Sequence, residues 1–431
     1  MKICFRNASL LDMVQGMQIK ENMQVWTEDG KISFVGTDAS AELFLRENDV
    51  TFQRIVDCKN NLLMPGFKNA HTHSAMTFLR SKADNLPLQE WLNHLVFPAE
   101  AKLSEKDIYA LTKLGILEYL QSGITGICEM YLTPDSIAAA CVDMGMRCTL
   151  TGGVNNFSQS VDDLKRWNKE LNKMNELIRF VPGFHAEYTC DKSLLCEIAG
   201  LAEELKTPVF AHVSETRKEV EECIARYGMT PVAFLDSLGM FRYGGCGYHL
   251  VHLQEDDYEI LKKRGVYAVT NPASNLKLAS GIAPVSRMLK EGIPVAIGTD
   301  GPASNNALDF FREMYLVSAL AKVREEDPSA VSGEEVLVMA CKNGAYACAT
   351  PDSDCIAPGK NADMVLIDLT QPNMRPLHNI VDNLVYAGSK INVKLTMVAG
   401  RILYEDGVFY TGTEQEEIYE EAERIANRIL G

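Results

Sequence analysis

An alternation of strand-like and helix-like stretches over residues 61–361 limits the possible folds of this α/β chain most strongly. Apolar runs such as CTLTGGV, PVFAHV, VYAVTN and PVAIGTD have the length of buried strands, and longer stretches such as SEKDIYALTKLGILEYLQSG separate them. About eight strand–helix units in roughly 300 residues are typical of a closed parallel barrel rather than an open sheet. We therefore predict a (β/α)8 barrel for residues 61–361.

The two ends of the chain have a different, β-rich character. Residues 1–60 contain runs such as MQIKENMQVWTEDGKISFVG, with a hairpin signal at Asp29-Gly30, and strand character returns in ADMVLIDL and KLTMVAGRILYEDGVFY. We predict that residues 1–60 and 362–431 form one small β domain together. The last segment, EQEEIYEEAERIANRIL, has the pattern of a charged amphipathic helix and is grouped with that domain.

Charge and cysteine usage exclude several classes of partner. The net charge is -16 at pH 7, which repels nucleic-acid backbones and anionic lipid. The apolar runs are too short to span a membrane, and the start MKICFRNASLLDMV lacks the pattern of a signal peptide. Twelve cysteines without a CxxC pair indicate free thiols in a reducing compartment. We expect a cytoplasmic protein that binds neither nucleic acid nor membranes.

Histidines and an aspartate stand at the ends of predicted barrel strands. His71 and His73 follow the run LLMPGF, and alternate residues of a strand point to the same face, so both imidazoles should project together. Later strands end on His212, His249 and Asp300. Each of these residues alone is explained as well by an ordinary polar residue at a strand end. Together they predict a divalent-metal site of a hydrolase, because imidazoles and carboxylates bind such ions.

The motifs around these residues resemble the amidohydrolase superfamily, and within it the branch that deaminates S-adenosylhomocysteine, methylthioadenosine and related adenosines. The resemblance covers nearly the whole chain. It implies a (β/α)8 barrel with a small β-sandwich built from both chain ends, a metal-dependent aminohydrolase and, as in many relatives, a homo-oligomer. The matching stretches are PGFKNAHTHSAMTFLR, LPLQEWLNHLVFPAEAKLSEKD, PVFAHVSETRKEVEE, TNPASNLKLASGIAPV, GTDGPASNNALDFFREM, ADMVLIDL and VAGRILYEDG.

The resemblance also implies one divalent ion. By motif, its ligands would be His71, His73, His212 and Asp300. Relatives with two metals carry a carboxylated lysine near the end of the fourth strand, and this chain reads VPGFHAEYTC there, without a lysine. Zinc is our default for the ion, although iron, manganese and cobalt suit the same ligands.

Roles in the reaction follow from the same resemblance. A bound ion lowers the pKa of water to about 7, and Asp300 would take the proton of that water. His249 would hydrogen-bond the water, and His252 would be a structural neighbour. Glu215, three residues after His212, would protonate a ring nitrogen of the substrate. Taken alone, Glu215 would be interpreted as a solvated glutamate at the start of a helix.

Three further residues match contacts to a nucleoside in the relatives. Trp91 matches a tryptophan that lines the pocket, and His185 matches a histidine that contacts the purine. Glu100 matches a glutamate that accepts hydrogen bonds from the ribose hydroxyls, a task that suits the paired oxygens of a carboxylate. By itself, Trp91 would be assigned to core packing, the commoner place for a tryptophan.

The chain departs from its relatives at two positions. Gly152 stands where relatives that bind S-adenosylhomocysteine place an arginine on the amino-acid carboxylate, and neither Arg147 nor Arg166 matches that position. Because a bidentate arginine is lost, we predict a preference for methylthioadenosine, 5′-deoxyadenosine or adenosine over S-adenosylhomocysteine. The second departure is Thr270, where many relatives have a histidine before Asn-Pro.

Two alternative functions stay open from the sequence. The same scaffold deaminates guanine or a pterin in some relatives, and it removes amine or chloride from a triazine in others. An assay with guanine beside adenosine would separate these substrates. The second alternative is a non-catalytic scaffold, and the complete set of predicted ligands counts against it.

Overall fold

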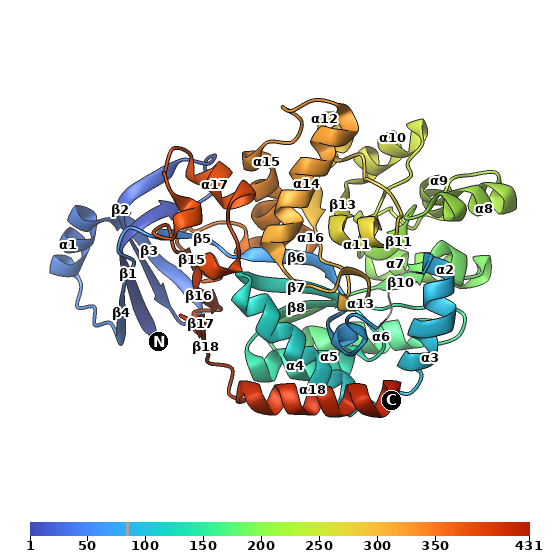
Figure 1. The fold of residues 1–431 in the computed structure, drawn as a ribbon, viewed down its shortest axis with the longest axis horizontal. Coiled ribbons are helices and arrows are strands. Elements are labelled where there is room, and N and C mark those ends of the chain that lie inside the picture. The colour runs from blue at the N-terminus through green and yellow to red at the C-terminus, as the bar shows by residue number, and fades with distance from the viewer. Residues whose placement is uncertain (83–85) are drawn as a thin grey trace.

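The computed structural model describes residues 1–82 and 86–431, and its centre is a ring of parallel strands (Figure 1). Two hydrogen-bonded sheets make up the ring, and in each sheet neighbouring strands follow one another in the sequence. The strands of the first sheet are β6 (Phe67–Thr72), β7 (Ile124–Met130), β8 (Arg147–Thr151) and β9 (Ile178–Val181). The strands of the second are β10 (Gly183–Ala186), β11 (Val209–Val213), β12 (Gly245–His249), β13 (Val266–Thr270) and β14 (Val295–Ile297).

The two sheets join at both sides and close the barrel. At one side, Pro182 separates β9 from β10; it has no N–H for the ladder, but its carbonyl accepts a hydrogen bond from the N–H of Phe210 at 3.2 Å. At the other side, the N–H of Asp300, just beyond β14, donates to the carbonyl of His71 in β6 at 3.0 Å. When β9 and β10 are taken as one interrupted strand, the described residues form the eight-stranded barrel that the sequence predicts.

Helices follow the strands and pack against the outside of the barrel; α5 contacts β8, α10 contacts β13 and α12 contacts β14 (Figure 1). Their bounds are α2 (Leu88–Trp91), α3 (Phe97–Glu100), α4 (Glu105–Gln121), α5 (Pro134–Met144), α6 (Val161–Glu170), α7 (Lys192–Leu205), α8 (Arg217–Tyr227), α9 (Pro231–Ser237), α10 (Glu255–Arg264), α11 (Pro272–Lys277), α12 (Val285–Glu291), α13 (Pro302–Asn305), α14 (Phe310–Glu325), α15 (Gly333–Leu337) and α16 (Gly344–Ala347). Among the described residues, no helix is long and apolar enough to cross a membrane.

Both ends of the chain contribute to a separate nine-stranded sheet, at the left of Figure 1. Its order is β18-β17-β16-β15-β5-β1-β2-β3, and β4 pairs with β1. The prediction of a β domain built from both ends is confirmed. Its strands are β1 (Lys2–Leu11), β2 (Ile19–Glu28), β3 (Lys31–Thr37), β4 (Arg54–Asp57), β5 (Leu62–Pro65), β15 (Met364–Ile367), β16 (Val393–Val398), β17 (Arg401–Glu405) and β18 (Val408–Phe409), and α1 (Asp38–Glu47) and α17 (Ile380–Tyr386) lie in the same terminal regions.

The apolar run before the HxH motif is divided between the two parts of the protein. The sequence predicts Leu62–Phe67 as one strand leading into the barrel, but Leu62–Pro65 forms β5 of the terminal sheet, and the first barrel strand begins at Phe67. Gly66 lies at the change of sheet, where a Cβ atom would stand 2.1 Å from the side chain of Thr125. The predicted domain boundaries at 60/61 and 361/362 stay predictions.

The C-terminal helix α18 (Gln415–Leu430) lies along α4 of the barrel, away from the terminal sheet with which the sequence grouped it (Figure 1). The reason is its apolar stripe, which the barrel side buries: Ile418, Ala422, Ile425 and Ile429. Arg428 also pairs with Asp107 of α4 at 2.5 Å. The predicted amphipathic helix is therefore present, and its place in the fold differs.

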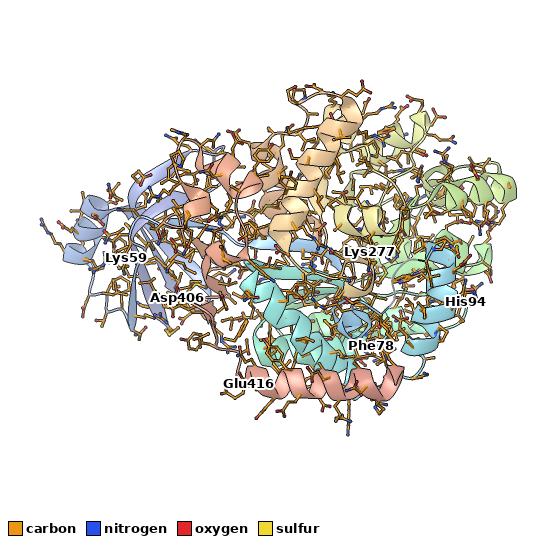
Figure 2. The ribbon with its side chains drawn as sticks, in the orientation of Figure 1. Lys59, Phe78, His94, Lys277, Asp406 and Glu416 are labelled. Atoms are coloured by element: carbon orange, nitrogen blue, oxygen red, sulfur yellow. The ribbon has the colours of Figure 1, made fainter. Side chains whose placement is uncertain are left out.

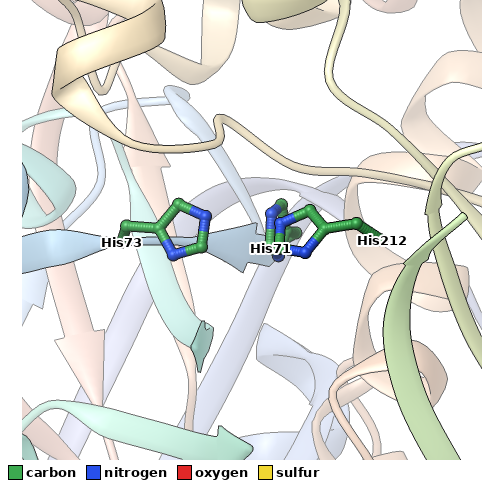
Figure 3. A group of neighbouring side chains, drawn as sticks. All are labelled: His71, His73 and His212. Carbon is green, nitrogen blue, oxygen red and sulfur yellow. The ribbon is translucent and has the colours of Figure 1, made fainter. Parts of the chain in front are cut away.

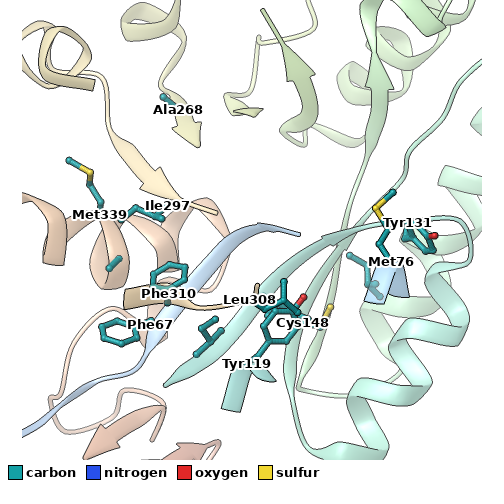
Figure 4. Packing of buried hydrophobic residues seen from close by; sticks show 14 of the residues in the cluster. Phe67, Met76, Tyr119, Tyr131, Cys148, Ala268, Ile297, Leu308, Phe310 and Met339 are labelled. Carbon is teal, nitrogen blue, oxygen red and sulfur yellow. The ribbon is translucent and has the colours of Figure 1, made fainter. Parts of the chain in front are cut away.

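Separate apolar cores fill the two parts. In the barrel, the ring of Phe67 packs 5.5 Å from that of Phe310, between a strand and a helix (Figure 4). In the terminal sheet, Trp26 stacks on Phe34 at 4.1 Å. In Figure 2, Lys59 lies beside the terminal sheet at the left, whereas the exposed His94 lies on the barrel part toward the right.

A buried ion pair joins the barrel to the terminal sheet. Arg147, at the start of β8, donates from Nε and Nη2 to the carboxylate of Asp363 at 2.7 and 3.2 Å. Ser353 Oγ and the N–H of Ala399 donate to the same carboxylate, each at 2.7 Å. Burial disfavours the charged carboxylate, but the positive charges of Arg147 and Lys68 outweigh burial and lower the pKa of Asp363.

We expect Asp363→Ala to lower the free energy of unfolding by about 3–5 kcal/mol, because it leaves the buried Arg147 guanidinium without its partner. Urea or thermal unfolding of the purified variant measures this change. Asp352→Ala is the matched control, since the Asp352 side chain is 69% exposed and its removal should change stability by less than about 0.5 kcal/mol. Equal stability of the two variants would contradict the structural role of Asp363.

Candidate active site

The predicted metal ligands meet at the carboxyl ends of the barrel strands (Figure 3). The ring centroid of His71 lies 4.7 Å from that of His73 and 4.8 Å from that of His212. One ring nitrogen from each of the three lies within 4.8 Å of the others. Asp300 Oδ1 is 3.5 Å from His71 Nε2 and 3.1 Å from His73 Nε2. Residues from three distant strands thus form one group of metal-ligand type.

The backbone turns sharply where these strands end. Ser214, His249 and Asp300 have φ angles of 54°, 75° and 59°. Non-glycine residues rarely adopt this left-handed conformation, which costs about 1–3 kcal/mol at each position. Strain of this kind persists where the surrounding structure enforces it, and here it directs the segments carrying Glu215, His249 and Asp300 toward one another.

The chemistry of the donors fits a divalent ion. Both ring nitrogens of His71 are buried and have no hydrogen-bond partner in the described part of the chain. Burial lowers the pKa of His71 to about 3, so its imidazole is neutral and keeps a lone pair for a metal. His212 Nδ1 lies 2.6 Å from the carbonyl oxygen of His185, and His73 Nδ1 contacts that of Met130. These contacts occupy one nitrogen of each ring and leave Nε2 for ligation.

His73 and Asp300 share a strong electrostatic interaction. Burial disfavours the charged form of both, but their contact outweighs it, raising the pKa of His73 to about 9 and holding that of Asp300 well below its usual range. A cation that binds both groups replaces the proton on His73, since metal ligands bind in their deprotonated forms. The histidine and aspartate side chains thus constitute a metal site.

His249 and Glu215 lie beside the metal ligands. His249 Nε2 is 3.8 Å from Glu215 Oε2, and a nitrogen of His249 also lies within 4.8 Å of ligand atoms of His71 and Asp300. From the motifs we predicted only a role in the reaction for His249, whereas this geometry also permits it to approach a metal. Burial raises the pKa of Glu215 despite the nearby His249, which favours a neutral acid able to donate a proton.

A cavity of about 510 Å³ adjoins this group. Its lining includes the groups assigned to the metal and the reaction: His73, His212, Glu215, His249 and Asp300. It also includes the predicted nucleoside contacts Trp91, Glu100 and His185, together with apolar residues such as Leu88 and Phe97. All three predicted nucleoside contacts therefore lie in the same cavity as the predicted groups of the reaction.

Glu100 is the most unusual residue in the wall of that cavity. Its side chain is buried, and its Oε1 atom has no hydrogen-bond partner among the described residues. Burial raises the pKa of Glu100 to about 7. A buried acceptor without a donor is costly, so a ligand that supplies hydroxyl donors fits here. Nearby, His185 Nδ1 contacts Thr189 Oγ1 at 3.0 Å, and burial lowers the pKa of His185 to about 4.

Two serines that the sequence did not single out hold Asp300. Ser274 Oγ and Ser304 Oγ donate to Asp300 Oδ2 at 2.5 and 2.9 Å. Both stand in the tetrapeptide PASN, which occurs at Pro272–Asn275 and again at Pro302–Asn305. The repetition of PASN shortly after two strand ends was the signal in the sequence.

The two departures from the relatives lie outside the cavity wall. Neither Gly152 nor Thr270 lines the cavity, although Gly153 does. The half-buried His252 also stays outside, with its Nε2 2.7 Å from the carbonyl oxygen of Ser280, in agreement with the structural place predicted for it.

A comparison with protein families decides where this chain belongs. Residues 62–403, most of the chain, match the model of the family described as the amidohydrolase family. The chain belongs to the amidohydrolase family. As in the prediction from the motifs, membership extends from the HxH segment to the strands after the barrel.

Similar amidohydrolases carry names that refer to adenosine derivatives. The chain is 38% identical over 437 residues to the 5-methylthioadenosine/S-adenosylhomocysteine deaminase of Thermoanaerobacter pseudethanolicus, covering 100% of both chains. It is 40% identical over 384 residues to the 5′-deoxyadenosine deaminase of Methanothermobacter thermautotrophicus, covering 88% of this chain and 90% of the other. An adenosine deaminase from Xanthomonas campestris, solved with bound zinc, superposes with a TM-score of 0.92 and is 31% identical, covering 99% and 98% of the two chains.

Proposed function

We propose that this amidohydrolase is a metal-dependent deaminase of adenosine-type nucleosides, which hydrolyses the amino group from the purine ring and yields the inosine analogue and ammonia. One observation carries the proposal: the same cavity is lined by the histidine–aspartate metal group, by Glu215, whose pKa burial raises, and by the buried Glu100, whose Oε1 has no hydrogen-bond partner among the described residues. The names of its relatives, which deaminate adenosine derivatives, support the same reaction.

The metal ligands would be His71, His73, His212 and Asp300. When bound, a divalent ion, for which we propose zinc, supplies the Lewis-acid chemistry that makes water nucleophilic at neutral pH. Asp300 takes the proton of the attacking water. The two serines on Oδ2 of Asp300 keep its Oδ1 directed toward His71 and His73.

Protonation of the ring is assigned to Glu215. Burial raises its pKa and so favours the protonated carboxyl group, and transfer of that proton to a ring nitrogen lets the ring accept the attacking oxygen without developing a full negative charge. His249 hydrogen-bonds the attacking water and holds it against the ring carbon. Asp300 then passes the proton that it took from water to the amino group, the hydroxyl of the tetrahedral carbon returns a proton to Glu215, and the C–N bond breaks to release ammonia as the carbonyl forms.

The other wall of the cavity would hold the nucleoside. Trp91 supplies an apolar surface, His185 contacts the purine, and Glu100 accepts hydrogen bonds from the ribose hydroxyls. Two hydroxyl donors favour the charged form of Glu100, whose pKa burial has raised, and they satisfy its unpartnered oxygen.

Relatives that form dimers or tetramers also lead us to propose a homo-oligomer, which sedimentation velocity would test.

The finer substrate preference depends on charge. Among residues 1–82 and 86–431, no lysine or arginine lines the cavity. S-adenosylhomocysteine carries a carboxylate and an ammonium at its far end, and the carboxylate would enter the cavity without a cationic partner. Substrates with an uncharged 5′ group avoid this cost.

We therefore expect kcat/KM for methylthioadenosine, 5′-deoxyadenosine and adenosine to exceed that for S-adenosylhomocysteine by at least about tenfold, since a hydrogen bond to a charged group contributes about 1.5–3 kcal/mol. Ammonia release from metal-loaded protein measures the whole panel, with guanine and a pterin added. Equal or better turnover of S-adenosylhomocysteine would refute the preference. Activity only on guanine or only on the pterin would be compatible with the proposed metal site, but it would contradict the roles of Trp91, Glu100 and His185.

A further inference from the structure

One short segment contacts all three groups to which the proposed reaction assigns proton transfer or water binding. Residues 271–280, read as NPASNLKLAS, include α11 and the turn after it. We propose that this stretch is the positioning segment of the active site: its side chains fix the orientation of Asp300, His249 and Glu215 together. The inference rests on the proposed function, and it adds residues that act through the catalytic groups.

The first contact orients Asp300. Ser274 Oγ donates to Asp300 Oδ2 at 2.5 Å, and Ser304 donates to the same atom. Rotation of the carboxylate is thereby blocked, and Oδ1 is the oxygen that lies 3.1 Å from His73 Nε2. Ser274 thus decides which carboxylate oxygen faces the ligands.

The second contact sets the tautomer of His249. Asn275 Oδ1 lies 2.7 Å from His249 Nδ1, and Asn271 Nδ2 lies 3.4 Å from the same nitrogen. The amide oxygen at the shorter distance can only accept, so this contact favours the tautomer with the proton on Nδ1. His249 Nε2 then keeps its lone pair on the side of Glu215, whose Oε2 is 3.8 Å away. Orientation of an imidazole by a partner on its far nitrogen is the same device that fixes metal-binding histidines.

The third contact orients Glu215. Ser280 Oγ donates to Glu215 Oε1 at 3.2 Å, which leaves Oε2 on the side of His249. Ser280 is itself held, because its carbonyl oxygen lies 2.7 Å from His252 Nε2. His252 therefore contributes to the site indirectly, by supporting the serine that contacts Glu215.

The segment is clamped to the barrel, as a positioning element has to be. The N–H of Ala273 donates to the buried carboxylate of Glu313 in α14 at 3.0 Å. Within the segment, the N–H of Ser280 donates to the carbonyl of Asn275 at 2.8 Å and holds the turn after α11. Gly298 makes room for the first residue of the segment, since a Cβ atom there would stand 2.3 Å from Asn271 Oδ1. A displacement of the segment would consequently disturb all three contacts at once.

Asn275→Leu tests the proposal, because leucine has a similar volume and cannot accept the Nδ1 proton. The readouts in solution are metal content per chain, and kcat and KM for methylthioadenosine. Two Kd values are also measured: that of the inosine-type product, and that of an analogue of the tetrahedral intermediate, a nucleoside whose ring carbon is tetrahedral and carries a hydroxyl. We expect kcat and the affinity for the tetrahedral analogue to fall together by about 10- to 100-fold. Metal content, KM and product affinity should stay within about twofold of the wild type, as expected for an interaction made in the transition state.

Two further variants make the test independent of folding and volume. Asn275→Asp keeps an acceptor oxygen and should recover most of the lost kcat, whereas a purely structural role would give no such rescue. Ser280→Ala removes the contact to Glu215 and should lower kcat in the same pattern, which preserves the test should Asn275→Leu fail to fold. Ser286→Ala, a buried serine of α12 outside the cavity, is the control and should keep wild-type kinetics.

The outcomes separate this inference from the function on which it rests. A metal-loaded wild type that releases no ammonia from any adenosine overturns the proposed function. An active wild type with unchanged kcat in both Asn275→Leu and Ser280→Ala overturns the positioning segment alone. Equal losses of product and analogue affinity would also overturn it, because they indicate general damage to the cavity.

Discussion

Glu215→Gln should lower kcat by about 10²- to 10⁴-fold, the range in which general acid catalysis contributes. Glutamine has the size of glutamate and still donates a hydrogen bond, but its amide cannot release a proton to a ring nitrogen. Burial raises the pKa of the Glu215 carboxyl, and its Oε2 lies 3.8 Å from His249 Nε2. Single-turnover ammonia release from methylthioadenosine measures the effect.

The control for this variant lies on the helix that follows. Glu222→Gln removes an exposed carboxylate of α8, outside the cavity, and should leave kcat unchanged. Metal content and product affinity of Glu215→Gln should match those of the wild type, because Glu215 lies outside the proposed ligand set. A loss of kcat smaller than about tenfold would assign the ring protonation to another group.

Removal of the metal should lower kcat by more than about 10³-fold, because the pKa of water then returns from about 7 toward its bulk value of 15.7. Dialysis against a chelator followed by elemental analysis gives the ion content, and addition of zinc should restore both content and activity. The thermal midpoint should rise on reloading, since an ion that binds only the folded state stabilises it.

His71→Ala makes the metal prediction specific to this site. Its ring supplies two buried nitrogens without hydrogen-bond partners in the described residues, and Nε2 lies 3.5 Å from Asp300 Oδ1, so the alanine variant loses a ligand at the centre of the metal group. Zinc should fail to restore its activity at concentrations that saturate the wild type. His94→Ala is the matched control, as this exposed histidine lies outside the cavity wall. Full activity of metal-free protein would contradict both predictions.

The barrel and its metal group were predictable because their signals are local. His71 lies in β6 and His73 directly after its last residue, and the two-residue period of a strand predicts that both face the same side. The alternation of apolar runs with helical stretches likewise depends on short windows of sequence. The geometry of the histidine group follows once parallel strands place their carboxyl ends at one rim of the barrel.

Other features depend on contacts that no short window contains. The apolar run Leu62–Phe67 does not reveal which sheet each half joins, because buried strands of either sheet have the same composition. The apolar stripe of α18 predicts a buried face without naming the surface that buries it. Ser274 and Ser280 look like ordinary helix and turn residues in the sequence, and they reach Asp300 and Glu215 only because α11 packs beside two strand ends.

The place of β5 in the terminal sheet determines when that sheet can be completed on the ribosome. β5 (Leu62–Pro65) pairs with β1 (Lys2–Leu11), which is already made when β5 emerges, and with β15, where Leu63 lies opposite Leu366. At about 5–20 residues per second, the roughly 300 intervening residues take about 15–60 s to synthesise. During that time the nascent chain presents an unpaired apolar strand edge, the kind of surface that invites aggregation. The first half of the barrel thus emerges next to an unfinished sheet, and a chain that stops before residue 364 never acquires the strand that covers it.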